Sequence, residues 1–278
     1  MRVPWAALGR AALVFCGWLL VGLLVFRGLV FEPGVVADGD LGSPLDETLT
    51  LQYHASTWNP WAQGFSIHPP KLVLVAPMTA LTFLGIPDET VAKLYLPVIL
   101  AIAGTSGSLT LLAILRDRPP AARWAGALVG GAALALDPWA LSRLMAHYWL
   151  VLGYALWPPA VWLYWRALEE GARPGRLAIL AALLAVQGVQ LHLVFQTALV
   201  MAFVGAFHLA TAPSPRPWLR FLRVTGATVA LFVGFSAFWL VPFGAAAFSI
   251  GTAPAYAVTE DVVSLLSRNQ HPSWVLAG

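Results

Sequence analysis

Charge is scarce in this chain of 278 residues, since only 10% of the residues are charged and 59% are hydrophobic. A soluble domain of this length needs about a quarter of its residues charged, so a soluble fold is excluded. The apolar runs are continuous and do not alternate with polar residues, which excludes a transmembrane β-barrel. A disordered chain is excluded too, because such chains are poor in hydrophobic residues. The composition predicts an all-α polytopic membrane protein.

Cysteine is almost absent as well. The single cysteine, Cys16, lies inside the first apolar run, where it can form no intrachain disulfide and is expected to be a small apolar filler. Phosphate-binding loops, serine-hydrolase elbows, zinc-protease motifs and paired cysteines are all missing. The sequence therefore gives no support to a soluble-type ATPase, a serine hydrolase or a zinc protease, and we predict no metal-binding motif.

The excess of basic residues is small, with 16 Lys and Arg against 13 Asp and Glu, so the chain is not predicted to bind nucleic acid. Eleven of these basic residues lie near the N-terminus or in three short loops, around residues 116–123, 166–176 and 216–223. Because basic residues accumulate in cytoplasmic loops, we expect these loops and the N-terminus to be cytoplasmic. Ten of the 13 acidic residues then lie outside. The protein is predicted to be integral to the cell membrane.

The apolar runs predict about seven transmembrane helices in one transmembrane domain, residues 1–278. The strongest runs cover residues 8–30, 91–115, 124–136, 148–168, 177–210 and 224–248. The run 177–210 is too long for one crossing of about 30 Å, and polar residues around Gln187 interrupt it, so we expect a hairpin of two short helices. Gly126 and Gly130 are spaced for close packing against a neighbouring helix.

The long loop after the first helix, residues 31–90, is expected to be extracytoplasmic. Its segment 71–85 is apolar but too short for an ordinary span. Counting this segment as a span would also reverse the orientation of every later loop. We therefore expect a helix that lies on the outer membrane surface.

The same loop holds the first group of candidate functional residues. Asp38 and Asp40 flank Gly39, and carboxylates so close together can serve as a general base or hold a divalent cation. The alternative is a solvated acidic loop, because acidic residues are expected outside under any topology. Trp58, together with His68 and Lys71, follows later in the loop.

Arg143 and His147 are a second group of candidates. Basic residues are disfavoured on the outer side of a membrane, so Arg143 requires a compensating anion there. The two residues are four positions apart, and on one helical face they would present two donors to a lipid phosphate. The alternative is an ion pair of Arg143 with Asp137 or with an acidic residue of the external loop.

Polar residues near the predicted hairpin turn form a third group. Gln187, Gln190, His192 and Gln196 lie at membrane depth or just outside it. Such side chains either line a polar cavity that receives a substrate or form hydrogen bonds between helices. Both alternatives are open at this point.

The order of these features resembles that of the GT-C membrane glycosyltransferases, which include protein O-mannosyltransferases and large actinobacterial arabinofuranosyltransferases. In that superfamily a first helix leads into a long external loop with an acidic motif, followed by a surface-lying helix and further spans. Asp38-Gly39-Asp40 takes the place of the acidic motif, where the mannosyltransferases carry an Asp-Glu pair. His68-Pro69-Pro70-Lys71 is similar to their His-Pro-Pro motif, and residues 137–158 resemble a stretch of the arabinofuranosyltransferase type.

The resemblance implies transfer of a sugar from a polyprenyl-phosphate donor to an acceptor at the outer membrane face. It implies that Asp40 or Asp38 deprotonates the acceptor, with a divalent cation as an open possibility, and that no nucleotide is needed. The residues expected to contact the lipid-linked substrate are Arg143, His147, Lys71, His68, Trp58, Gln190 and His192.

Two other classes of function stay open. The first is a non-catalytic subunit in which the same helices bind membrane lipids or a partner protein. The second, a transporter, is less favoured because the chain has no clear internal repeat. The large relatives continue well past residue 278, so the resemblance implies either an N-terminal part that lacks a C-terminal domain or a reduced relative without activity.

Overall fold

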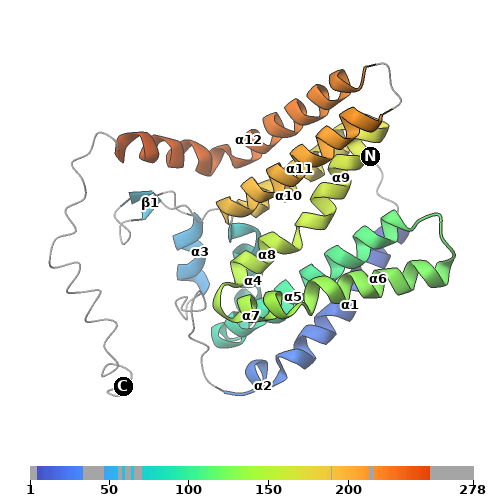
Figure 1. Ribbon diagram of the computed structural model, residues 1–278. Helices are drawn as coiled ribbons and strands as arrows, with labels where there is room; N and C mark the ends of the chain where they lie inside the picture. Colours follow the sequence, from blue (N-terminus) through green and yellow to red (C-terminus); the bar gives the residue numbers. More distant parts are fainter. Residues whose placement is uncertain are drawn as a thin grey trace.

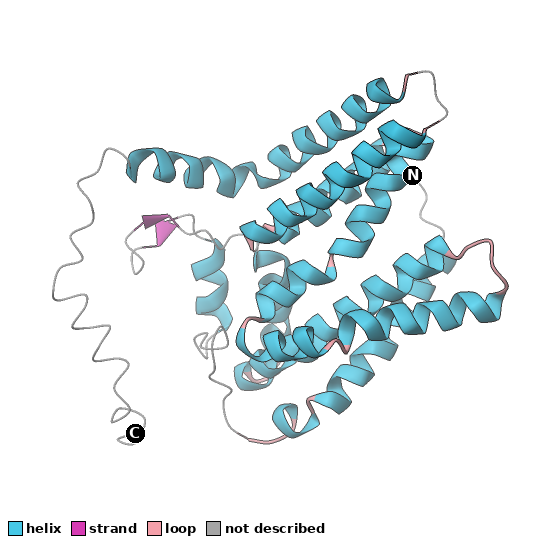
Figure 2. Cartoon of the chain, viewed as in Figure 1, coloured by secondary structure: helices cyan, strands magenta, loops and turns pink. Residues whose placement is uncertain are grey.

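The computed structural model describes residues 5–33, 47–55, 58–59, 64–65, 71–188, 190–212 and 216–250. Within these ranges nearly every residue is helical (Figures 1 and 2). The described residues also include one antiparallel pair of two-residue strands, β1 (Trp58–Asn59) and β2 (Gly64–Phe65). The prediction of an all-α fold is confirmed.

Helices occupy each of the places where the sequence predicts a crossing. In chain order they are α1 (Trp5–Val25), α2 (Arg27–Val30), α3 (Glu47–Ala55), α4 (Leu72–Phe83), α5 (Asp88–Ile114), α6 (Pro120–Ala135), α7 (Pro138–Ala146), α8 (Tyr148–Ala155), α9 (Trp157–Glu170), α10 (Pro174–Gln187), α11 (Leu191–Thr211) and α12 (Pro217–Ile250). The predicted span 148–168 is broken into α8 and α9. The run 177–210 is indeed two helices, α10 and α11, separated at residues 188–190.

Among the described residues, four helices are long and apolar enough to cross a membrane, and they are α1, α5, α11 and α12. A fifth crossing results if α6 and α7, which are bent by 48° relative to each other, form one span. α10 and α4 are apolar but shorter. The structure thus supports a polytopic membrane protein, and the count of seven crossings stays a prediction.

Proline and glycine determine where several helices begin and end. α6, α7, α9 and α10 each carry a proline in the first turn, where the missing N–H removes no intrahelical hydrogen bond. α9 ends at Glu170, and Gly171 after it has a φ of 97°, a conformation that favours glycine. These signals keep the connections around residues 116–119 and 171–173 short.

Small residues allow α5 and α6 to approach each other closely. A Cβ atom on Gly107 of α5 would lie only 2.2 Å from the carbonyl oxygen of Gly130 on α6. Gly126 similarly leaves room for the side chain of Leu115. The predicted packing role of Gly126 and Gly130 is therefore confirmed.

The buried side chains form two clusters. The first joins α1, α4, α5, α7 and α8, with Leu96, Ile99 and Trp149 among its members. The second joins α9, α10, α11 and α12 around residues such as Tyr164 and Leu180. The break between α8 and α9 therefore lies where the chain passes from one cluster to the other.

The loop 31–90 contains more helical structure than the sequence predicts. α4 forms within the segment expected to lie on the membrane surface, and it buries Leu74, Val75 and Met78. α3 was not predicted, and it packs against α4. The structure thus confirms a helix at 71–85, whereas its position on the outer membrane surface stays a prediction.

The two ends of the molecule differ in their connections. In Figure 1 the α5–α6 turn, the end of α11 and the start of α12 lie at one end, whereas α2, α3 and α7 lie at the other. α5 runs between these ends, with Lys93 near its start and Arg116 just after its last residue. We call the end of the molecule that carries α2, α3 and α7 the loop end. We call the end that carries the α5–α6 turn the arginine end.

Candidate functional site

Some of the predicted site residues cannot be placed. Asp38, Asp40 and His68 lie outside the described residues. Trp58 lies in β1, where it pairs with Phe65 of β2. The other candidates, Lys71, Arg143, His147, Gln190 and His192, are within the described ranges.

Lys71 contacts an aromatic cluster at the loop end. It precedes α4, and its Nζ lies 5.0 Å from the ring centroid of Trp149, which is a cation–π contact. Trp149 is only 2% exposed and packs against Tyr95 and Tyr148, with ring centroids 6.0 and 4.7 Å away. The buried rings thus hold the ammonium group beside the first turn of α8.

Arg143 and His147 lie at the junction of α7 and α8. α7 ends at Ala146, and His147 adopts φ −145° and ψ 60° between the two helices. The backbone thus leaves the helical path at His147, and a shared helical face of the two side chains stays a prediction. The backbone N–H of His147 still donates to the carbonyl of Arg143 at 2.6 Å. The side chains of Arg143 and His147 are both exposed, and they lie four residues apart at the end of α7.

Asp137 has partners other than Arg143. Its carboxylate accepts the backbone N–H of Trp139 at 3.0 Å and caps α7. The hydroxyl of Tyr154 lies 3.5 Å from the other carboxylate oxygen. In the part of the chain that the structure describes, no ion pair joins Arg143 to Asp137. Arg143 is exposed at the end of α7, and its binding of a lipid phosphate stays a prediction.

Gln187 forms hydrogen bonds between helices. Its side chain is fully buried, its Nε2 donates to the carbonyl of Gly153 at 3.1 Å, and its Oε1 accepts from Thr197 at 2.9 Å. These bonds join α10 to α8 and α11, which confirms the interhelical alternative for this residue. Gln190 is half-buried and His192 is exposed at the start of α11.

Lys93 is a further cation at the loop end, and it is almost completely buried. Its Nζ donates to the carboxylate of Glu89 at 2.7 Å and to the carbonyl of Glu32 at 2.6 Å. The contact ties the first turns of α5 to the residues that follow α2. Because both acceptors are protein groups, Lys93 is a structural cation.

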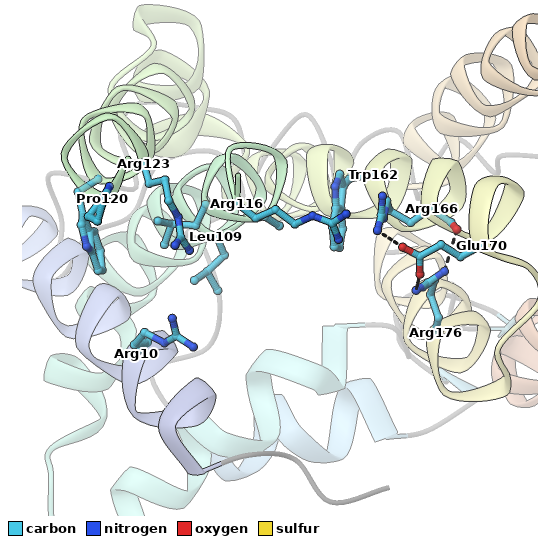
Figure 3. A pocket seen from close by; sticks show the side chains of 12 residues that line it. Arg10, Leu109, Arg116, Pro120, Arg123, Trp162, Arg166, Glu170 and Arg176 are labelled. Carbon is cyan, nitrogen blue, oxygen red and sulfur yellow. Dashed lines mark hydrogen bonds and ion pairs between the residues drawn. The ribbon is translucent and has the colours of Figure 1, made fainter. Parts of the chain in front are cut away.

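At the arginine end, the predicted cytoplasmic loops enclose a cavity of about 480 Å³ (Figure 3). It is lined by five arginines, Arg10, Arg116, Arg123, Arg166 and Arg176, together with one acidic residue, Glu170, and apolar side chains. We used these arginines in the sequence only to assign topology and did not predict this cavity. The sequence did contain a signal for this cavity. If the short basic loops and the start of α1 are all cytoplasmic, their arginines must lie together at one end of the helices.

Ion pairs connect the end of α9 to the start of α10 on one side of this cavity. Glu170 bridges Arg166 and Arg176, and Arg166 also lies 3.2 Å from Glu169. Arg176 donates to the carbonyl of Arg166 at 2.7 Å, at the C-terminal end of α9. Cations are favourable at this end of a helix because its carbonyl groups are partly negative.

Within the described ranges, no group of three or more His, Cys, Asp or Glu side chains is placed to hold a metal ion. Asp38 and Asp40, for which a divalent cation was considered, lie outside these ranges. No protein-family model, curated protein or solved structure matches the chain.

Proposed function

We propose that the chain is a GT-C-type membrane protein that transfers a sugar from a polyprenyl-phosphate donor to an acceptor hydroxyl. The observation that carries this proposal is the contact of Lys71 with Trp149. Trp149 lies two residues after His147, next to the bend that follows Arg143. The contact places the ammonium group of Lys71 beside the start of α8, and Arg143 and His147 precede α8 in the chain. A lipid-linked sugar donor needs positive charge at its phosphate.

The proposed reaction uses the carboxylates and the cations in different roles. Asp40 or Asp38 takes the proton from the acceptor hydroxyl, whose oxygen forms a bond to the anomeric carbon of the sugar. The bond between that carbon and the phosphate oxygen breaks, and polyprenyl phosphate leaves with the bonding electrons. Lys71 and Arg143 stabilise the negative charge on this leaving group.

The proposed topology has seven crossings, a cytoplasmic N-terminus and an extracytoplasmic loop 31–90. It is supported by the helices at each expected crossing and by the convergence of basic residues at the arginine end. Basic residues favour the cytoplasmic side. The reaction is accordingly assigned to the extracytoplasmic surface.

Reconstituted protein tests the activity directly. The protein in liposomes is given a panel of polyprenyl-phosphate sugars, and release of polyprenyl phosphate is followed together with sugar transfer. We expect turnover with at least one donor, and we expect Lys71→Met to lower it while Lys71→Arg retains most of it. Binding of polyprenyl phosphate without turnover of any donor would favour the non-catalytic lipid-binding subunit instead.

A further inference from the structure

The cavity at the arginine end carries an excess of positive charge. Its lining contains five arginines but only one acidic residue, Glu170, which already bridges Arg166 and Arg176. Arg116 lies 3.3 Å from Asp117, but both side chains are largely exposed, so this ion pair neutralises little charge inside the cavity. An anion in the cavity would relieve the repulsion among these guanidinium groups.

Arg123 supplies a second and independent observation. Its Nε atom is buried, and within the described part of the chain it has no hydrogen-bond partner. A buried N–H of a charged group is costly without an acceptor. Figure 3 shows Arg10 and Arg123 on one side of the cavity and the ion pairs of Arg166 on the other, with Arg116 reaching toward Trp162 between them. Because this Nε is inaccessible, an anion in the cavity would contact the terminal nitrogens of the Arg123 guanidinium group instead.

The remaining walls of the cavity are apolar. They are formed by Leu109, Leu112 and Ala113 of α5, Trp124 of α6 and Trp162 of α9. A small soluble phosphate would make no use of these walls. A ligand with a charged head and a hydrocarbon body fits both the arginines and the apolar side chains.

A second cavity of about 670 Å³ adjoins the first. The two share Ala113, Arg116, Trp162 and Arg166, so they form one continuous concave surface between α5 and α9. Two acidic residues of the second cavity, Asp117 and Glu169, pair with the shared arginines Arg116 and Arg166. Most of its other lining residues are apolar and include Leu111, Ile114, Val161, Trp165 and Val204. It offers hydrocarbon chains a groove that starts at the charged cavity.

We infer that this surface binds an anionic phospholipid, with its phosphate among Arg10, Arg116 and Arg123 and its acyl chains along the groove between α5 and α9. Arginine binds phosphate through paired N–H groups, and basic pockets between membrane helices suit anionic headgroups. The site lies at the opposite end of α5 from Lys71 and Trp149. It is thus separate from the proposed sugar-transfer site and does not depend on that function.

Native mass spectrometry of the detergent-solubilised full chain tests this inference. The probes are phosphatidylglycerol, phosphatidylcholine, polyprenyl phosphate and inorganic phosphate, each titrated separately. We expect phosphatidylglycerol to bind at lower concentration than phosphatidylcholine. We expect Arg10→Gln and Arg123→Gln each to weaken phosphatidylglycerol binding about tenfold, as for the loss of one charge-assisted contact. Polyprenyl phosphate binding should not change in these variants, because its proposed site is at the loop end.

Two exposed arginines of the same loops provide matched controls. Arg118 and Arg173 do not line either cavity, so Arg118→Gln and Arg173→Gln should leave phosphatidylglycerol binding unchanged. Equal weakening in the controls would overturn the inference, because general surface charge would then explain the binding. Competition by inorganic phosphate at similar concentration would also overturn it, since the site would then accept a free anion.

The groove is tested separately from the charged cavity. Ala113→Phe places a bulky side chain in the wall that the two cavities share, and we expect it to weaken phosphatidylglycerol binding about tenfold while thermal unfolding stays cooperative. An unchanged affinity in this variant would contradict the assignment of the acyl chains. Loss of phosphatidylglycerol binding with retained sugar transfer would separate this site from the proposed function.

Discussion

Thr197 on α11 and Gln187 on α10 are joined by a buried hydrogen bond, in which the Thr197 hydroxyl lies 2.9 Å from Oε1 of Gln187. The same amide donates to the carbonyl of Gly153 on α8 at 3.1 Å. One side chain thus connects three helices on both sides of the break at residues 188–190. Polar contacts of this kind replace water as partners for buried groups in a membrane protein.

Gln187→Leu should therefore destabilise the protein. The substitution keeps a similar volume but removes both hydrogen bonds, and we expect a loss of about 1–2 kcal/mol in the free energy of unfolding. Unfolding in detergent, followed by circular dichroism, measures this change. The matched control is Gln196→Leu, because Gln196 is exposed on α11. Equal stability of the two variants would show that the three-helix contact contributes nothing.

The close approach of α5 and α6 predicts a large effect from a single methyl group. In Gly107→Ala the new Cβ would lie 2.2 Å from the carbonyl oxygen of Gly130, a backbone atom that cannot turn away. The helices must separate, and we expect a loss of about 1–3 kcal/mol in stability. Gly17→Ala on α1 is the control, since nothing lies within 4 Å of its Cβ position. The control should be neutral or stabilising by up to about 1 kcal/mol, and thermal unfolding of both variants checks the difference.

The topology can be tested by cysteine accessibility. Cys16 is the only cysteine, so Cys16→Ala provides a background without thiols. In intact cells an impermeant thiol reagent should label a cysteine at position 32 but not one at position 118. The reason is that the basic loop after α5 is assigned to the cytoplasm. Labelling at position 118 from outside would reverse the orientation and make α4 a true crossing.

Asp40→Asn should abolish sugar transfer while the protein stays folded. The amide has the shape of the carboxylate but cannot accept the proton, and loss of a general base costs about 10²- to 10⁴-fold in rate. Asp38→Asn and Asp46→Asn are measured in parallel, with the smallest effect expected for Asp46. Parental rates in all three variants would mean that the acidic loop is only solvated.

Arg143→Ala should weaken binding of polyprenyl phosphate more than Arg143→Lys, because the lysine retains a positive charge. Equilibrium binding of the lipid in detergent measures both affinities. Arg118→Ala at the other end of the molecule serves as the control for general charge. If both variants at position 143 bind like the parent, Arg143 has no role at the phosphate.

The helices at the expected crossings follow directly from the apolar runs, because burial in lipid requires long apolar segments with internal hydrogen bonds. α3 was missed for the same reason, since Glu47–Ala55 is only weakly hydrophobic. Its neighbour in the fold is α4, so its helical structure depends on tertiary packing. Hydropathy does not reveal such a contact.

The bend at His147 could not be predicted from local signals. No glycine or proline lies between Pro138 and Gly153, so the sequence contains no residue that stops a helix there. The chain turns where Tyr148 and Trp149 become buried against Tyr95 of α5. Packing between distant segments thus outweighs local helix propensity at this point.

The arginine cavity was missed because its members come from five helices, α1, α5, α6, α9 and α10, and from the turn after α5. Charge counting placed these residues on one side of the membrane but could not say which of them face each other. Arg118 and Arg173 lie outside the cavity although they share its loops with Arg116 and Arg176. Arg116 and Arg118 lie in the turn after α5, and Arg173 directly precedes α10, so the path of these connections decides which arginines reach the cavity.

The length of α5 bears on how the protein fits its bilayer. Its charged first turns end at Lys93, and the remaining residues 94–114 extend about 32 Å at a rise of about 1.5 Å per residue. This is close to the hydrocarbon thickness of about 30 Å, so α5 can stand nearly upright with its charges among the headgroups. A thinner bilayer would force α5 to tilt. Because α6 is held against Gly107 at backbone contact, it would have to tilt together with α5.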